Sequence, residues 1–366
     1  MRVMHFVTGG FSGATQVAVD LCRAAQRGQG MDVLLALRRK PSTDPARVDA
    51  LRNEGLDVRV VSNWSHAATI WALRNLARDW KPDVLVAHGF SEHLWGRYAG
   101  LLAGVPQLVH VEHNSRERYT RWRLAQALWL ARRSAATVGV SLGVRDHLLS
   151  LGFPAERCIA IPNGVELARF RAVPTRLWQD REDAILMASR FGRQKDHATL
   201  LRALALLKSK GLTPPLALAG GGKQRQRKAM EALVRRLGLD AQVRFLGQVA
   251  DMPDLLARQR IFVLSTHYEG MPLALVEAMA AGCACIGSDV VGVREVISHG
   301  RTGLLVPEGD AQALADALES LLTQPERAEA LGRAACEQAE AEFDVSRMHA
   351  RYEALLRNVH AGRPLP

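Results

Sequence analysis

A strand, a loop and a helix are predicted around one segment, Tyr268-Glu269-Gly270-Met271-Pro272-Leu273-Ala274-Leu275-Val276-Glu277-Ala278-Met279-Ala280-Ala281-Gly282. The apolar run from Ile261 to Leu264 precedes it and is typical of a buried strand. Pro272 suits the first turn of a helix, where its missing N–H costs nothing, and Gly282 suits the end of that helix. Because the first N–H groups of a helix lack internal partners, this helix start favours a bound anion.

Two carboxylates, Glu269 and Glu277, bracket the predicted helix start. Glu277 would lie about 7–8 Å along the helix axis from Pro272. A carboxylate among Leu, Val, Ala and Met requires hydrogen-bond donors. One interpretation is that both glutamates accept hydrogen bonds from sugar hydroxyls around an anion held by the helix start. The other is a solvated Glu277 on an exposed helix face and a loop Glu269. This segment alone supports both interpretations equally.

The composition is that of a soluble enzyme of two domains. The chain has 366 residues, of which 48% are hydrophobic and 23% charged. It has no run of about 18 apolar residues that would predict a membrane span. Residues 1–7 lack the features of a signal peptide. The five cysteines are odd in number and scattered, which favours a reducing compartment. We therefore expect a cytoplasmic protein.

Positive charge is concentrated in the N-terminal half. The net charge is +11; residues 1–165 contain 21 Lys and Arg against 13 Asp and Glu, and the remainder contains 27 against 24. Residues 116–133 are rich in Arg and Trp and include Arg116, Arg118, Arg121, Trp122 and Arg123. This pattern predicts either a surface for an anionic acceptor or membrane, or an ordinary helix with its Trp side chains in the core. We favour the surface, and expect no nucleic-acid partner because no binding module is recognisable.

Short apolar runs alternate with amphipathic stretches along the chain, except between Pro162 and Trp178. Such alternation predicts parallel β-α-β units. We therefore expect an α/β fold of two Rossmann-like, doubly wound parallel-sheet domains facing across a cleft. The expected domains are residues 1–165 and 166–345, with a C-terminal helix, 346–360, packing back on the first. Ligands of such sheets bind beyond the carboxyl ends of the strands, so the loops there form the candidate site.

Loops at the predicted strand ends carry the candidate functional groups. Gly13 follows the first strand, where a missing side chain would let the backbone approach a phosphate. His113 stands just past a strand end and would bond either a sugar hydroxyl or nearby backbone. Arg190 and Lys195 are spaced to clamp a diphosphate, unless their loop is simply solvated. Gly247 follows a further predicted strand, Val243–Phe245, and could lie against a base.

Taken in order, these motifs resemble the retaining glycosyltransferases of family 4 in the two-Rossmann GT-B architecture (glycosyl transferases group 1). The similarity covers nearly the whole chain and is strongest from Ala184 to Asp310. It is carried by Glu269 and Glu277 with seven residues between them, the Arg190 and Lys195 pair, glycines at 220–222, Phe245-Leu246-Gly247, and Thr302-Gly303-Leu304-Leu305-Val306-Pro307. Departures occur at Ser12-Gly13-Ala14-Thr15, where the family often has Gly-Gly-Ala-Glu, and at Ser189, where a glycine is usual.

The resemblance implies roles by position. Glu277 would bind the ribose of a sugar nucleotide and Glu269 the hydroxyls of the donor sugar, while the N-terminal domain would face the acceptor. The residues expected to act in catalysis are His113, Glu269, Arg190 and Lys195. The residues expected to bind the donor are Gly13, Arg190, Lys195, Gly247, Glu269, Gly270, Met271, Leu273, Ala274 and Glu277.

The expected reaction is transfer of a hexose from a nucleotide-diphosphate sugar to a glycan or lipid-linked acceptor in cell-envelope polysaccharide or lipopolysaccharide synthesis. The family implies front-side transfer with retention, in which the departing diphosphate takes the acceptor's proton. No cofactor and no metal are expected, and the sequence has no Asp-x-Asp pair of the metal-dependent architecture. Two alternatives remain open: a sugar-nucleotide epimerase on the same fold, and a non-catalytic nucleotide-sugar-binding subunit.

Overall fold

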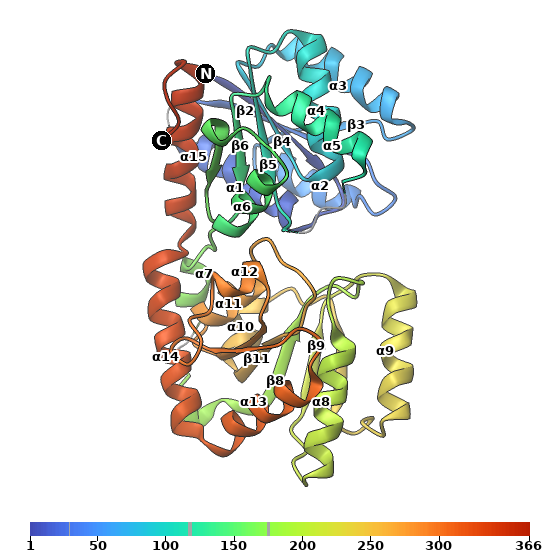
Figure 1. Cartoon of the computed structure of the whole chain (residues 1–366), viewed down its shortest axis with the longest axis vertical. Helices are drawn as coiled ribbons and strands as arrows, with labels where there is room; N and C mark the ends of the chain where they lie inside the picture. The colour runs from blue at the N-terminus through green and yellow to red at the C-terminus, as the bar shows by residue number, and fades with distance from the viewer. Residues whose placement is uncertain (29, 116–118, 174–175) are drawn as a thin grey trace. The chain divides into compact units, whose positions relative to one another are not determined.

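The chain forms two compact units (Figure 1). Unit 1 comprises Met1–Asn163 with Met348–Pro366, and unit 2 comprises Gly164–Arg347. The computed structural model describes residues 1–28, 30–115, 119–173 and 176–366, and only the backbone of residues 90 and 91. The sequence analysis drew the boundary after residue 165 and assigned 346–360 to the first domain.

Unit 1 is built on a seven-stranded sheet in the order β3-β2-β1-β4-β5-β6-β7, with every neighbouring pair parallel. Its strands are β1 (Arg2–Thr8), β2 (Asp32–Arg38), β3 (Asp57–Val61), β4 (Val84–His88), β5 (Gln107–Glu112), β6 (Ala136–Gly139) and β7 (Cys158–Ala160). Its helices are α1 (Gly13–Arg27), α2 (Pro45–Asn53), α3 (His66–Trp80), α4 (Phe90–Ala103), α5 (Arg121–Ala131), α6 (Leu142–Ser150), the 3-10 turn η1 (Ala155–Arg157) and most of α15 (Val345–His360).

Alternation along the central strands places helices on both faces of this sheet. Met4 and Phe6 of β1 pack in one buried cluster with Leu73 of α3. Val7, which points to the other face, packs in a second cluster with Val19 of α1. Because each fully buried apolar side chain contributes about 1.5–3 kcal/mol, both helical layers hold the sheet firmly.

Unit 2 has a six-stranded parallel sheet in the order β10-β9-β8-β11-β12-β13. Its strands are β8 (Glu182–Ala188), β9 (Leu216–Ala219), β10 (Val243–Gly247), β11 (Gln259–Leu264), β12 (Ala284–Ser288) and β13 (Leu304–Val306). Its helices are α7 (Ala168–Arg171), η2 (Trp178–Asp180), α8 (His197–Ser209), α9 (Gln224–Arg236), α10 (Met252–Ala257), α11 (Leu273–Ala280), α12 (Val291–Arg294), α13 (Ala311–Thr323) and α14 (Pro325–Glu342).

The predicted class, two doubly wound parallel α/β units, is confirmed, and two local details differ. Pro272 precedes α11 as its N-cap instead of lying in its first turn, because its ψ of 92° is extended. Gly282 follows α11 with a φ of +73°, as expected for a helix end. The short strand β7 was not predicted. None of the helices within the described residues is both long and apolar enough to cross a bilayer.

Candidate functional site

An ion pair stands at the carboxyl edge of the unit 2 sheet. Lys195, in the loop after β8, pairs through Nζ with Oε1 of Glu269, in the loop after β11. Both side chains are largely buried, at 16% and 8% exposure. The hydroxyl of Thr266 donates a hydrogen bond to the same Oε1 at 2.8 Å. The structure thus brings together two of the predicted catalytic side chains, and adds Thr266, which the sequence analysis did not single out.

Hydrogen bonds hold the two loops against each other. Gln194 Nε2 donates to the Tyr268 carbonyl at 2.7 Å, and the His267 N–H donates to the Gln194 carbonyl at 2.9 Å. Ser265 Oγ donates to the Asp196 carbonyl at 2.7 Å. Because these bonds join residues next to Lys195 and Glu269, they hold the two loops of the ion pair together.

Two glycines let further strand-end loops approach this pair. A Cβ on Gly292 would lie 2.4 Å from the carbonyl oxygen of Gly270 and 2.7 Å from that of Glu269. Gly220 has a φ of +131°, and a Cβ there would lie 2.1 Å from the Ser189 carbonyl oxygen. The loops after β8, β9, β11 and β12 therefore form one close-packed rim at the carboxyl edge.

The other predicted donor-binding residues of unit 2 lie along the same edge. Arg190 is the second residue after β8 and is exposed. Gly247 ends β10 with a φ of +70°, and its carbonyl accepts the Gly220 N–H at 2.6 Å. Glu277 is half-buried on α11. The remaining members are at the start of α11: buried Gly270 and Met271, and half-buried Leu273 and Ala274.

His113 of unit 1 is anchored by both backbone and ring. The carboxylate of Glu112 accepts the N–H of His113 at 2.8 Å and that of Asn114 at 3.3 Å. Its ring Nε2 lies 3.3 Å from Nδ1 of His88, so the ring partner is another histidine and not nearby backbone. Burial lowers the pKa of His113 to about 3. The imidazole is therefore neutral at physiological pH.

Gly13 is less constrained than expected. It is the first residue of α1, it is exposed, and a Cβ there would meet nothing within 4 Å. The crowded glycine of this loop is Gly9, whose Cβ would lie 2.7 Å from Thr43 Oγ1 and 2.8 Å from the Arg38 carbonyl oxygen. Packing therefore explains Gly9, while Gly13 leaves room above the helix start.

Within the described part of the chain, one group has metal-ligand geometry: His93, His110 and Glu112, all buried, with ligand atoms within 4.8 Å of one another. Nδ1 of His93 lies 2.6 Å from the guanidinium of Arg97, and Arg97 is itself fully buried. Nε2 of His93 lies 3.0 Å from the Tyr119 hydroxyl. Burial lowers the pKa of Arg97 to about 10, so it stays charged. A divalent cation would meet that charge, and the cluster therefore suits a buried arginine better than a metal.

The Arg-rich segment is only partly visible. Arg116 and Arg118 lie outside the described residues. Arg121 begins α5 and is exposed, Trp122 is 74% exposed, and Arg123 is half-buried. The alternative of a core position is therefore wrong for Trp122.

A hollow of 610 Å³ opens at the carboxyl edge of the unit 1 sheet and was not predicted. Its lining comes from the ends of β2 and β3 and the residues after them: Arg39, Lys40, Pro41, Val60, Ser62, Asn63 and Trp64. Trp64 is 90% exposed. A flat aromatic ring beside two cations is suited to a sugar carrying negative charge.

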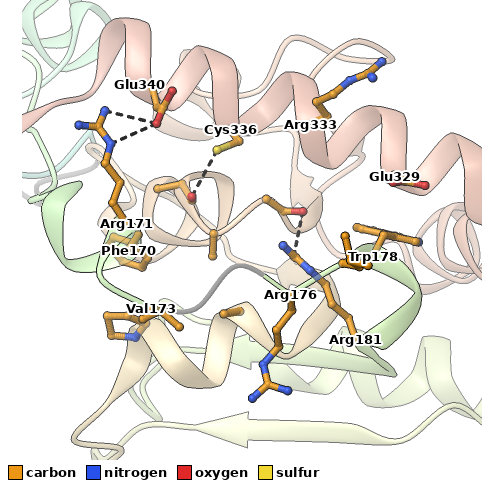
Figure 2. A pocket seen from close by; sticks show the side chains of 16 residues that line it. Phe170, Arg171, Val173, Arg176, Trp178, Arg181, Glu329, Arg333, Cys336 and Glu340 are labelled. Atoms are coloured by element: carbon orange, nitrogen blue, oxygen red, sulfur yellow. Dashed lines mark hydrogen bonds and ion pairs between the residues drawn. The ribbon is translucent and has the colours of Figure 1, made fainter.

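Figure 2 shows a second cavity, of 460 Å³, at the amino edge of the unit 2 sheet. Arg181, which precedes β8, donates to the carbonyl of Gly282, which precedes β12, at 3.2 Å. Arg171 pairs with Glu340 at 3.3 Å. None of the predicted donor-binding residues, all of which are described, lines this cavity. Since ligands of such sheets bind at the opposite, carboxyl edge, it is not the candidate site.

Comparison with known proteins gives a consistent result. The model of Glycosyltransferase Family 4 matches residues 11–169, and that of Glycosyl transferases group 1 matches residues 171–338. The glycogen synthase of Mycobacterium tuberculosis is 29% identical over 278 residues, covering 73% of this chain and 66%, just under two thirds, of the synthase. The putative glycosyltransferase EpsF of Bacillus subtilis is 29% identical over 310 residues, 79% of each chain.

A solved structure shares the fold over nearly the full length. The crystal structure of Anabaena HepE in complex with UDP-glucose has a TM-score of 0.86 at 23% identity, covering 98% of this chain and 100% of HepE. The two family models lie on the two halves of the chain in which the parallel sheets were found. With its GT-B fold and these matches, the chain belongs to glycosyltransferase family 4, of the glycosyl transferases group 1.

Proposed function

We propose that this enzyme moves a hexose from a nucleoside-diphosphate sugar to a hydroxyl of a glycan or lipid-linked acceptor, with retention of configuration and without a metal ion. The observation that carries the proposal is the Lys195–Glu269 ion pair at the rim beside the start of α11. It fixes a cation suited to a diphosphate next to a carboxylate suited to sugar hydroxyls. The complex of HepE with UDP-glucose supports a nucleotide sugar as the donor.

Donor binding uses the charges of this rim. Lys195 carries three N–H donors, so it can keep its bond to Glu269 while donating to a phosphate oxygen. Arg190, exposed at the same edge, supplies a planar fork for the diphosphate. Each such charge-assisted hydrogen bond contributes about 1.5–3 kcal/mol. The N–H groups of Leu273 and Ala274 add donors at the helix start, and Glu277 accepts from the ribose.

Other backbone groups of the rim complete the donor pocket. Gly270 and Met271 line the approach to the sugar, and Gly247 leaves space for the base. His113 of unit 1 bonds a sugar hydroxyl as a neutral imidazole, a role that its low pKa supports. Gly13 offers open backbone to the donor phosphate or the acceptor.

Transfer proceeds on one face of the sugar. The bond between the anomeric carbon and the diphosphate oxygen breaks while the acceptor oxygen bonds to that carbon from the same side. The acceptor's proton passes to the departing diphosphate. The protein's contribution is positioning and stabilisation of the negative charge that builds on the leaving group, supplied by Arg190, Lys195 and the start of α11. Glu269 acts as a binder and not as a nucleophile.

The acceptor is proposed to be anionic and to belong to a cell-envelope polysaccharide or lipopolysaccharide. The positive excess of residues 1–165 and the exposed Arg121 and Trp122 support this class of partner. The same surface, with half-buried Arg123, is proposed to rest on an anionic membrane on its cytoplasmic side. Nucleic acid is not proposed as a partner.

One assay tests the proposal. The purified chain is incubated with UDP-glucose and other nucleoside-diphosphate sugars, with and without envelope extracts, in buffer containing EDTA. Release of nucleoside diphosphate that depends on the extract, with an α-linked product from an α-linked donor, is the expected result. Recovery of an epimerised nucleotide sugar would indicate an epimerase, and binding without turnover would indicate a regulatory subunit. Absence of binding to any nucleotide sugar would reject the proposal.

A further inference from the structure

Three histidines form a connected row across neighbouring strands of unit 1. His5 lies in β1, His88 ends β4, and His113 follows β5. Nδ1 of His5 lies 3.0 Å from Nε2 of His88, and Nδ1 of His88 lies 3.3 Å from Nε2 of His113. The ring centroids are 5.3 Å and 5.5 Å apart. We call this set the histidine row.

Strand register explains the row. His5 pairs with Val86, so His88 lies one strand over and two residues nearer the carboxyl edge. His88 pairs with Val111, so His113 makes the same step again. Because side chains of a strand alternate between faces, steps of two residues keep all three rings on one face. The row therefore leads from the middle of the sheet to its carboxyl edge.

The row is enclosed, which determines its protonation. His5 and His88 are each 1% exposed. Burial lowers the pKa of His5 to about 4 and that of His88 well below its usual range. All three imidazoles are therefore neutral at physiological pH, and each has one N–H donor and one acceptor nitrogen.

Because the three rings are neutral, the tautomer of each ring restricts the tautomer of its neighbour. Both contacts join the Nδ1 of one ring to the Nε2 of the next, and one nitrogen in each contact must donate. If His5 donates from Nδ1, His88 accepts at Nε2 and must itself donate from Nδ1, and so on to His113. If His113 donates from Nε2, the same argument runs in reverse. We propose that His5 and His88 act as positioning residues, which tie the tautomer of His113 to their own by requiring all three rings to carry the proton on the same nitrogen.

The coupling sets what His113 presents to a ligand. Nδ1 of His113 makes no hydrogen bond to any residue that the structure describes, and the residue is half-buried. A row protonated on Nδ1 makes this atom a donor; a row protonated on Nε2 makes it an acceptor. This consequence for a sugar hydroxyl rests on the proposed function, whereas the shared tautomer does not.

Nitrogen-15 NMR of the full chain labelled at histidine tests the row directly, because the two ring nitrogens differ in shift when one carries the proton. At pH 7.5 we expect His5, His88 and His113 to be neutral and protonated on the same nitrogen. Assignment uses single His→Phe variants. Different tautomers among the three rings, or a protonated ring, in the unaltered chain would each overturn the proposal.

Two variants test positioning at a distance. In His88→Phe and in His5→Phe we expect the tautomer populations of His113 to change, because each variant removes a ring whose tautomer is tied to that of His113. The control is His147→Phe, which removes a half-buried histidine of α6 outside the row and should leave His113 unchanged. Thermal melting shows whether each variant is folded. If the His113 tautomer persists in folded His88→Phe, the row does not position it.

Activity separates this inference from the proposed function. We expect the kcat of His88→Phe to fall about tenfold, the effect of one misdirected hydrogen bond, with little change in the donor KM. A shared tautomer in a chain that transfers no sugar would refute the function and leave the row intact. Mixed tautomers in an active enzyme would refute the row alone.

Discussion

Neighbouring strand ends at the carboxyl edges of the two sheets differ in their electrostatics. In unit 1 the edge carries two joined neutral imidazoles at the ends of β4 and β5, buried His88 and half-buried His113. In unit 2 it carries a formal ion pair, Lys195 with Glu269. A neutral ring discriminates hydroxyls through hydrogen-bond direction, whereas a cation stabilises a diphosphate through charge. In the proposed function, one sheet plan, present twice in the chain, would serve two chemical tasks.

The largest effect is expected from breaking the charged edge. Lys195→Ala should lower kcat about 100- to 1000-fold, the range for loss of one preorganised group that stabilises developing charge. The donor KM should change less, because the charge on the leaving group grows mainly in the transition state. The measurement is steady-state release of nucleoside diphosphate with acceptor present.

The matched control for this variant is Lys210→Ala. Lys210 also belongs to unit 2 and forms ion pairs with Asp316 and Glu319, but it follows α8 at the far end from the rim. Its activity should equal that of the unaltered chain. Equal losses in the two lysine variants would mean that the Lys195 effect reflects general stability and not leaving-group stabilisation.

A smaller effect is expected from crowding the same edge without touching its charges. Gly292→Ala should lower the free energy of unfolding of unit 2 by about 3 kcal/mol, because a Cβ at 2.4 Å from the Gly270 carbonyl forces backbone to move. The displaced loop carries Glu269, so the donor KM should rise as well. Urea unfolding and donor titration measure the two effects.

Gly192→Ala is the control for crowding. Gly192 is also in a rim loop, but the nearest atom to an added Cβ is the Arg190 carbonyl oxygen at 4.0 Å. It should fold and bind donor normally. A Gly292→Ala chain as stable as this control would show that the loops after β11 and β12 separate easily, and the rim would not be rigid.

The sequence predicted the parallel α/β units because apolar runs and helical spacing are local signals. Strand β7 was not predicted because its three residues, Cys158–Ala160, are too few to show the alternation of a strand. The spacing of Arg190 and Lys195 predicted a diphosphate clamp, and that role stays a prediction. The pairing of Lys195 with Glu269 was not predicted, since the two loops are 74 residues apart and their hydrogen-bonded register is a property of the folded rim.

The histidine row of unit 1 could not be predicted from the sequence for the same reason. A lone His in an apolar strand is ordinarily interpreted as a core residue, and nothing near His5 or His88 in sequence indicates a partner. Their connection depends on the order β1-β4-β5, which the alternation of strands and helices does not specify. The need for a glycine at position 292 could not be predicted either, because the carbonyl that requires it lies in another loop.

The next largest effect is expected from acid, which should destabilise unit 1 through His5. His5 has a folded pKa of about 4 against about 6.5 when unfolded, so the unfolded state binds more protons between these values. Its contribution to stability is complete above pH 6.5 and is lost as the pH falls toward 4. At pH 5 the loss is about 2 kcal/mol for this one histidine.

Hydrogen exchange of backbone amides measures this loss separately in each unit. Between pH 7.5 and pH 5, after correction for intrinsic rates, the opening free energy of β1 should fall more than that of β8 or β11. In His5→Gln the fall in β1 should be smaller by about 2 kcal/mol, since no group titrates at that position. The same pH dependence in both chains would contradict a neutral, buried His5.

The smallest effect is expected at the basic surface, where the side chain of Arg121 is exposed to water. Arg121→Ala should weaken binding to phosphatidylglycerol vesicles about fivefold, because one surface cation contributes about 1 kcal/mol near an anionic membrane. Salt should reduce the difference, as it screens charges that face water.

Arg236→Ala, which removes an exposed arginine at the end of α9 in unit 2, is the control and should bind as the unaltered chain does. Sedimentation with vesicles gives the affinities. If both arginines contribute equally, binding follows net charge and has no preferred face. If only Arg121 contributes while kcat on a soluble acceptor is unchanged, the surface presents the enzyme to its membrane, and the chemistry depends on the two sheet edges alone.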